Sequence, residues 1–190
     1  MSHLEAFARR ATLDDVEEIV RLAAVMFMSM GLDPGDDWDR LAGEALRARL
    51  GDDVEAFVVD HPDDDGLVSC GVGTIAQRLP GPLSRAGHVG YIQWIATDEP
   101  WRRRGFSRAV MQALLDWYDE RGIQVVELHA TSAGEPLYRS FGFTSGDYPA
   151  MRLVTPRSST GRTSSGPSAA SGHSAASSSA SSRSRQSRRK

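Results

Sequence analysis

Four arginines surround a single glycine in one short stretch of the sequence: Arg102, Arg103, Arg104, Gly105, Phe106, Ser107 and Arg108. An apolar run precedes this stretch and a helical pattern follows it, so the glycine is expected between a strand end and a helix start. Glycine lets the backbone approach a ligand closely, and the free N–H groups of a first helical turn favour a phosphate. Arginine side chains add forked donors that suit phosphate oxygens. The stretch therefore predicts a phosphate-bearing ligand, although a solvated arginine cluster at a helix start would have the same composition.

Two common nucleotide-binding motifs are excluded at this loop. A Walker loop needs two spaced glycines followed by Lys-Ser or Lys-Thr, and the dinucleotide-binding fingerprint needs several glycines. Only Gly105 is present here. By itself the loop indicates an anion and does not say which one.

The elements around the loop predict an α/β protein with a mixed sheet. Alternating apolar runs and helical stripes, separated by Gly and Pro, give the order βααβββαβαββ. Strands are expected at 4–11, 56–59, 67–76, 88–97, 123–130, 143–145 and 150–154, and helices at 16–30, 38–50, 106–121 and 135–141. The unit from 88 to 130 is expected to be a right-handed crossover between parallel strands.

Two motifs together resemble the GCN5-related N-acetyltransferases, the GNAT superfamily. The loop is similar to the family signature Gln/Arg-x-x-Gly-x-Gly/Ala, since Arg102 matches the first position and Gly105 the fourth. Ser107 departs from the small apolar residue that is usual at the sixth position. Residues 136–143, Pro-Leu-Tyr-Arg-Ser-Phe-Gly-Phe, are similar to the family's Leu-Tyr-x-x-x-Gly-Phe. The separation of the motifs and the element order also agree, and the resemblance implies the GNAT fold.

The resemblance implies an acetyl-CoA-dependent N-acetyltransferase that moves an acetyl group to a primary amine by direct attack. In the family, acetyl-CoA enters where the fourth and fifth strands separate. The backbone of Ile95, Ala96 and Thr97 is then expected to pair with the acetyl and pantetheine part, and an N–H there can polarise the thioester carbonyl. The cofactor's pyrophosphate is expected on the loop residues Arg102, Arg103, Arg104, Gly105, Phe106, Ser107 and Arg108.

Tyr138 matches the family's tyrosine near the CoA sulfur, which implies a general acid that protonates the departing thiolate. A phenol is protonated at neutral pH and can serve in this role. The other reading is that Tyr138 only packs against the cofactor or hydrogen-bonds to it.

The general base is open. Histone-acetyltransferase relatives carry a glutamate in the fourth strand, and the matching position here is about Tyr91, so that solution is absent. Glu127 and His129 share one face of the fifth strand by alternation. Histidine titrates near neutral pH, so both residues are base candidates, but both also fit as hydrogen-bonded structural groups. A water relay without a dedicated base is a third solution.

Other residues carry weaker signals. His61 beside Pro62 and three aspartates fits a solvated acidic turn better than a metal site, and no metal is expected. Cys70 is alone and is expected to be a small core residue. Residues 26–38 are a candidate wall for an apolar acceptor pocket, because this region borders the acceptor site in the family.

The composition divides the chain into an expected domain at 1–154 and a tail at 155–190. The tail has no acidic, aromatic or large aliphatic residue and 14 serines, so it is expected to be disordered. Its seven basic residues leave residues 1–154 strongly acidic, because the whole chain has a formal net charge of −3. An acidic domain argues against a nucleic-acid partner, except through weak binding by the tail. Nothing resembles a signal peptide or a membrane span, which predicts a cytoplasmic protein.

Two further readings stay beside the enzyme. One is a non-catalytic acyl-CoA-binding or sensing module, which would keep the loop without turnover. The other is an interaction protein whose basic tail binds nucleic acid. The acceptor amine, small molecule or peptide, is not specified by the sequence, and a homodimer is compatible with the resemblance.

Overall fold

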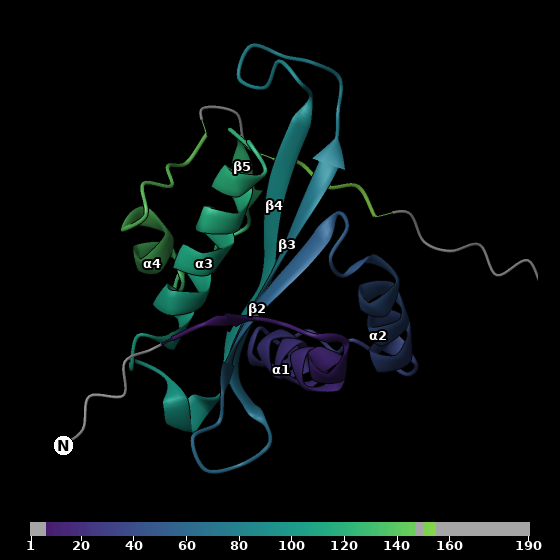
Figure 1. Ribbon diagram of the computed structural model, residues 1–190, viewed down its shortest axis with the longest axis vertical. Helices are drawn as coiled ribbons and strands as arrows, with labels where there is room; N and C mark the ends of the chain where they lie inside the picture. The colour runs from purple at the N-terminus through teal and green to yellow at the C-terminus, as the bar shows by residue number, and fades with distance from the viewer. Residues whose placement is uncertain (1–6, 147–149, 155–190) are drawn as a thin grey trace, which may run out of the picture. The chain divides into compact units, whose positions relative to one another are not determined.

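The computed structural model describes residues 7–146 and 150–154. Its helices and strands all lie in one compact unit that ends at Ser145 (Figure 1). In chain order they are β1 (Arg9–Arg10), the 3-10 helix η1 (Leu13–Asp15), α1 (Val16–Ser29), α2 (Trp38–Arg49), β2 (Val54–Asp60), β3 (Leu67–Gln77), β4 (His88–Thr97), the 3-10 helix η2 (Glu99–Trp101), α3 (Phe106–Glu120), β5 (Val126–Leu128) and α4 (Glu135–Arg139). Within the described ranges, no helix combines the length and apolarity needed to cross a membrane.

The strands of the described chain form one mixed sheet in the order β1-β2-β3-β4-β5. Neighbours from β1 to β4 are antiparallel, and β4 pairs with β5 in parallel. A parallel pair needs a connection that crosses over the sheet, and α3 supplies it. The sequence-based expectation of parallel strands joined through the arginine loop and its helix is confirmed.

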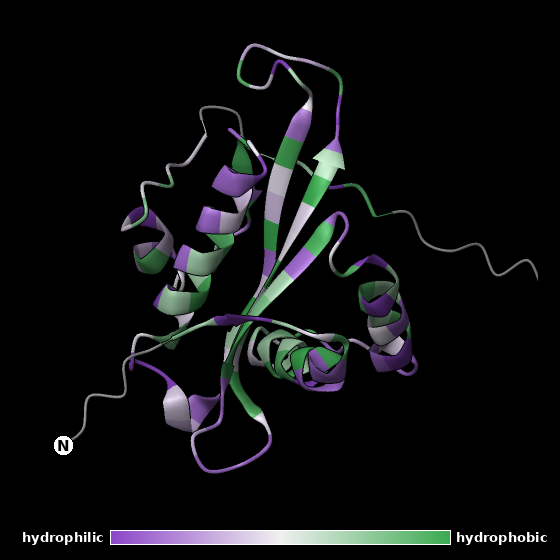
Figure 2. Cartoon of the chain, in the orientation of Figure 1, coloured by the Kyte–Doolittle hydropathy of each residue, from purple (hydrophilic) through white to green (hydrophobic). Residues whose placement is uncertain are grey.

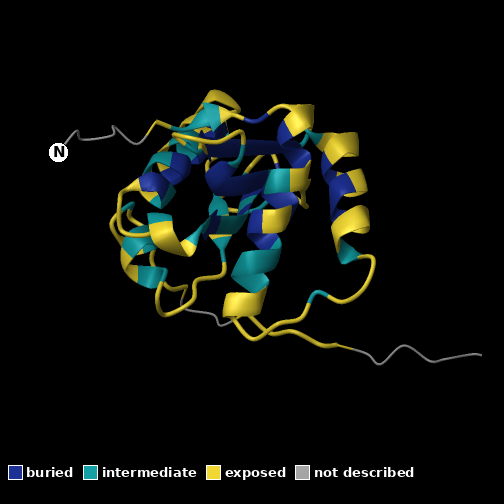
Figure 3. Ribbon diagram, turned by 90° about the horizontal axis from the view of Figure 1, so that it is seen from below, coloured by how far each residue is buried: buried dark blue, intermediate teal, exposed yellow. Residues whose placement is uncertain are grey.

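Helices cover both faces of the sheet, with α1 and α2 on one face and α3 on the other (Figure 1). Alternation along β2 divides its side chains between two apolar clusters: Val54, Ala56 and Val58 pack with α1 and α2, whereas Phe57 and Val59 pack with α3. Hydrophobic residues gather where the strands cross the centre of the unit and along α1 (Figure 2), and this central region is buried (Figure 3). The sheet is therefore a rigid support for the loops at its ends.

An ion-pair cluster joins β1, β2 and the start of α1. Arg9 donates to both carboxylate oxygens of Asp15 at 2.7 and 2.8 Å and also to Asp60 at 2.6–3.1 Å. Asp15 also accepts from the Thr12 backbone N–H at 2.7 Å, as in a capping box. Hydrogen bonds from Arg9 hold the pKa of Asp15 at about 2, well below its ordinary value.

A bulge interrupts β4 near its carboxyl end. Cys70 of β3 pairs with Ala96 and Val72 pairs with Gln93, so Trp94 and Ile95 together oppose one residue of β3. Trp94 has φ of +54°. A bulky residue in this region is a conformational outlier, which indicates that the surrounding structure holds it there.

Three expectations about strand extent are wrong. β5 covers only Val126–Leu128 of the expected 123–130, because the Ile123 N–H instead closes the end of α3 on Tyr118 O at 2.9 Å. Residues 143–145 form no strand, because the Phe143 N–H closes the end of α4 on Tyr138 O at 3.2 Å. The expected strand at 150–154 is exposed chain without strand pairing. The expected start of the first strand and the expected tail lie outside the described residues.

Candidate active site

β4 and β5 separate halfway along β4. Their pairing runs from Gly90–Val126 to Ile92–Leu128, and no residue in the described part of the chain pairs with β4 on that side beyond Ile92. The Asp98 N–H donates to Val68 O on β3 at 3.0 Å. Because backbone groups alternate sides along a strand, those of Thr97 are turned to the opposite, unpaired side. Of the predicted cofactor residues along this gap in the sheet, Ile95 belongs to the bulge, and Ala96 and Thr97 follow it.

The arginine loop lies at the carboxyl end of this gap. η2 ends at Trp101, Arg103 has φ of +65°, and Gly105 has φ of +90° as the residue before α3. Within the described chain, the backbone N–H groups of residues 103–107 have no hydrogen-bond acceptor, whereas those of Arg102 and Arg108 are bonded within the loop. A row of free N–H groups at the start of a 15-residue helix is an arrangement that favours an anion.

The arginine side chains mostly organise the loop itself. Arg102 Nε donates to Thr97 O at 3.1 Å, and Arg104 donates to Pro100 O at 3.1 Å with its guanidinium 4.6 Å from the centre of the Trp101 ring. Arg108 donates to Ser140 Oγ at 2.7 Å and lies over the Phe141 ring, which ties α3 to the segment after α4. Among the residues of known position, none hydrogen-bonds the side chain of Arg103. Three of the four arginines are therefore hydrogen-bonded to neighbouring segments, while all four remain exposed to solvent.

A chain of hydroxyl groups runs beneath the loop. Ser107 Oγ lies 2.8 Å from Thr97 Oγ1, which lies 2.8 Å from Ser69 Oγ. Ser69 is fully buried and donates to Ala96 O at 2.8 Å. These contacts join β3, β4 and α3 at the end of the gap. The sequence showed Ser107 only as a departure from a signature, because its partners are distant in the chain.

Tyr138 lies on α4, is partly buried and packs against the apolar cluster around α3. Gly134 leaves room for its ring, because a Cβ there would lie 3.1 Å from a ring carbon of Tyr138. Burial raises the pKa of the Tyr138 phenol above its ordinary value. Its hydroxyl has no hydrogen-bond partner among the described residues, so this phenol is neutral and its proton is available.

The two base candidates occupy different environments. Glu127 accepts from both terminal nitrogens of Arg78 at 2.8 and 3.0 Å, in an exposed bidentate ion pair. His129 lies just beyond β5, and its Nδ1 is 2.6 Å from Tyr91 Oη. Tyr91 pairs with Glu127 across the parallel strands. In the sequence, Tyr91 stands out only as the position where relatives carry a glutamate. Its contact with His129 depends on the register of β4 and β5, which one sequence does not reveal.

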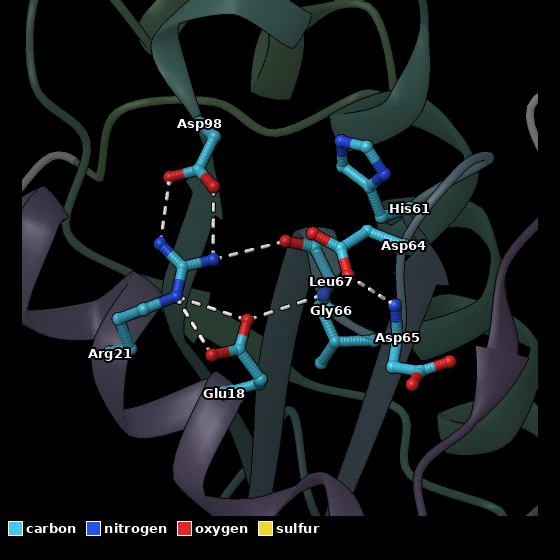
Figure 4. A pocket seen from close by; sticks show the side chains of 8 residues that line it. All are labelled: Glu18, Arg21, His61, Asp64, Asp65, Gly66, Leu67 and Asp98. Atoms are coloured by element: carbon cyan, nitrogen blue, oxygen red, sulfur yellow. Dashed lines mark hydrogen bonds and ion pairs between the residues drawn. The ribbon is translucent and has the colours of Figure 1, made fainter.

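A charged surface pocket of about 470 Å³ lies at the end of β4, between α1 and the turn that joins β2 to β3 (Figure 4). Arg21 fills its centre by bonding both oxygens of Asp98, at 2.9 and 3.1 Å, and both oxygens of Glu18. His61 at its rim packs edge-on against Trp101. The described ranges contain no group of three or more His, Cys, Asp or Glu side chains arranged to hold a metal ion.

Cys70 is a core residue, as expected from its position in a strand. Its side chain is fully buried, and burial raises the pKa of the thiol to about 12. A thiol in this state is not a nucleophile at neutral pH.

Comparisons with known proteins agree with this geometry. Residues 16–143 match the family model described as "Acetyltransferase (GNAT) family". No protein with a curated description matches the sequence.

Solved structures with this fold include acetyltransferases from several organisms. A predicted acetyltransferase from Clostridium acetobutylicum, solved with acetyl-CoA, has a TM-score of 0.70 at 20% identity over 77% of this chain and 94% of its own. A GCN5-related N-acetyltransferase from Ralstonia eutropha has a TM-score of 0.67 at 26% identity over 77% and 97%. Glucosamine-6-phosphate N-acetyltransferase from Arabidopsis thaliana has a TM-score of 0.59 at 17% identity over 78% and 97%. The parallel strands β4 and β5 separate, and free N–H groups line the loop at the start of α3. Together with a family model that matches residues 16–143, these features lead to one conclusion: the chain belongs to the GNAT family of acetyltransferases.

Proposed function

We propose that this protein transfers the acetyl group of acetyl-CoA to a primary amine by direct attack of the amine on the thioester. One observation carries the proposal: the unpaired edge of β4 leads directly to the free N–H groups of residues 103–107. An extended ligand with an anionic end fits this arrangement. Its neutral part can hydrogen-bond to the unpaired edge of β4. Its pyrophosphate can accept hydrogen bonds from the free N–H groups.

The cofactor contacts in this proposal follow the chain from the gap to the loop. Backbone groups of Ile95, Ala96 and Thr97 bind the acetyl and pantetheine part, and an N–H there polarises the thioester carbonyl. The loop binds the pyrophosphate through the free backbone N–H groups of residues 103–107. Arg108 supports the loop through its contact with Ser140.

Proton transfers at the reacting atoms are assigned to Tyr138 and His129. Tyr138 donates its proton to the departing thiolate, a role supported by its half-buried, neutral phenol. His129 accepts the proton of the amine, with Tyr91 bound to its Nδ1. Glu127 is the weaker base candidate, because Arg78 holds both of its carboxylate oxygens.

A glycine-to-glutamate exchange at the loop tests cofactor binding. Gly105→Glu adds a carboxylate beside the proposed pyrophosphate and should abolish binding of acetyl-CoA measured by calorimetry. Gly122→Glu is the matched control, because Gly122 ends the same helix, also has positive φ (+68°) and faces open space. Equal affinity of the two variants would overturn the proposal.

A thiol-release assay with a panel of amines separates an enzyme from a non-catalytic acyl-CoA-binding module. Release of CoA that depends on an amine supports the enzyme. Tight acetyl-CoA binding without release for any amine supports the module.

The domain boundary is also part of the proposal: residues 1–154 hold the activity, and 155–190 are a separate tail. Removing the tail should leave the rate of acetyl transfer unchanged. Any affinity of the full-length protein for nucleic acid should decrease when the tail is removed.

A further inference from the structure

A pocket of about 170 Å³ lies between α2 and the sheet, on the face opposite α3. Apolar side chains from α2, β2 and β3 form its sides: Ala42, Leu46, Val54 and Val72. Its end at β4 is formed by Gln93 and Trp94. The rest of the lining comes from Thr74 of β3 and from Trp38, Ala45 and Arg49 of α2. This space is named the α2 pocket below.

An edge-to-face aromatic stack fixes the two indoles of the pocket. The ring centres of Phe27 and Trp38 are 5.4 Å apart, and those of Trp38 and Trp94 are 5.7 Å apart. Such pairs hold rings in defined orientations. The stack connects α1, α2 and the bulge of β4, so the pocket wall is preformed.

The α2 pocket reaches the place where the sheet opens. Gln93 is the first residue of β4 beyond its pairing with β5, and Trp94 is the bulged residue with φ of +54°. The Gln93 side-chain amide has no hydrogen-bond partner among the residues that the structure describes. A molecule in the pocket can therefore extend a polar group toward the gap, with the Gln93 amide beside it.

The lining also selects by charge and size. Arg49 is the only charged residue that lines the pocket in the described chain, and Asp53 binds it at 2.6 and 3.0 Å. Without a lining carboxylate, the pocket has no group to pair with a second ammonium. A cavity of about 150 Å³ holds a benzene molecule, so the α2 pocket has room for one ring or one branched alkyl group.

We infer that the α2 pocket binds the acceptor, and that the acceptor is a primary monoamine with one apolar group of about benzene size. This inference rests on the proposed acetyl transfer. The apolar group lies against Trp38 and the aliphatic wall. The amine nitrogen lies at the bulge, where its N–H donates to the Gln93 amide oxygen and the Trp94 ring face attracts its charge before deprotonation.

The test narrows the pocket and measures acceptor use. Ala45 is an exposed residue of α2 that lines the pocket, so Ala45→Trp blocks it without removing a core side chain. Ala48→Trp is the matched control, since Ala48 is exposed on the same helix and does not line the pocket. The acceptors are 2-phenylethylamine, 3-methylbutylamine and spermidine, at saturating acetyl-CoA.

The wild type should use the two monoamines with kcat/KM about tenfold or more above that for spermidine, since one well-placed apolar group changes kcat/KM by about 10–200-fold. Ala45→Trp should raise the KM for 2-phenylethylamine about tenfold or more and leave the KM for acetyl-CoA unchanged, while Ala48→Trp behaves as wild type. Spermidine as the best acceptor, or equal behaviour of the two variants, would overturn the inference while leaving acetyl transfer intact.

If no amine releases CoA, the proposed function fails and the pocket is tested by binding alone. Calorimetric titration of 2-phenylethylamine into the CoA-saturated protein then measures whether the amine binds in the α2 pocket. Binding that Ala45→Trp abolishes and Ala48→Trp retains upholds the pocket. Absence of binding to the wild type overturns it.

Discussion

Tyr138 has a proposed role that depends on a single proton. Replacing it with phenylalanine removes that proton and keeps the ring, so kcat should fall about 10²-fold or more, the usual worth of a general acid. The KM for acetyl-CoA and the unfolding midpoint should stay near wild type, because its hydroxyl has no partner among the described residues. Burial raises the pKa of Tyr138, so the phenol should remain protonated beyond its ordinary titration range. Full turnover of the variant would remove the acid role.

Tyr91 and His129 are expected to act as one unit. Their 2.6 Å contact predicts that Tyr91→Phe and His129→Gln each lower kcat, by up to about 10²-fold, and that the double variant loses no more than the worse single one. Steady-state kinetics of the two single variants and the double variant measure this coupling.

Glu127→Gln is the control for this pair, since Glu127 lies on the same strand but is bound to Arg78. Its rate should stay within about threefold of wild type, because an exposed ion pair contributes little. A large loss in Glu127→Gln with a normal rate in His129→Gln would transfer the base role to Glu127.

At the scale of elements, the start of α1 depends on one carboxylate. Asp15→Asn weakens the charged hydrogen bonds from Arg9 and should lower the free energy of unfolding by about 1.5–3 kcal/mol at pH 7. The pKa of Asp15 falls from 3.8 to about 2 on folding. The ionised group therefore stabilises the fold fully above pH 4, and this contribution is lost as the pH falls from 4 to 2.

Urea unfolding at pH 7, 4 and 2.5 measures this effect. The difference between wild type and Asp15→Asn should shrink toward the lowest pH. Asp14→Asn, at the exposed neighbouring position, should match wild type throughout. A constant difference at all three pH values would contradict the assignment.

The elements also separate what one sequence can predict from what it cannot. The order through α4, the arginine loop and the position of Tyr138 were predictable, because periodicity and short motifs are local. The length of β5 was not predictable, because the β-branched residue Ile123 hydrogen-bonds to the end of α3 and does not begin the strand. Arg103 at positive φ was equally hidden, since local preference assigns that conformation to glycine. The contact of Tyr91 with His129 required the register of two strands far apart in the chain.

At the scale of the whole described unit, acetyl-CoA is expected to bridge β4 and β5 where these two strands are not paired. β5 is held to β4 over only three residues. A ligand at 100 times its dissociation constant stabilises the folded state by about 2.7 kcal/mol. Hydrogen–deuterium exchange should therefore slow on acetyl-CoA binding at residues 93–97, 103–107 and 126–128. Slowing confined to α1 and α2 would place the cofactor elsewhere.

The hydroxyl chain beneath the loop has a consequence for how charge is recognised there. Each hydroxyl carries one hydrogen. Ser69 uses its hydrogen on the Ala96 carbonyl, so Thr97 must donate to Ser69, and Ser107 must donate to Thr97. The direction of all three bonds follows from a carbonyl that cannot donate. Ser107 then turns only lone pairs outward, and an incoming phosphate meets no hydroxyl donor from it.

Ser107→Ala should accordingly leave acetyl-CoA affinity unchanged or slightly higher, while the loss of one hydrogen bond lowers stability by about 1 kcal/mol. Calorimetric titration and thermal unfolding of the variant measure the two effects separately. Ser107, in place of a small apolar residue, is thus expected to stabilise the contact of α3 with β4. Recognition of the anion is then expected to depend on the backbone N–H groups.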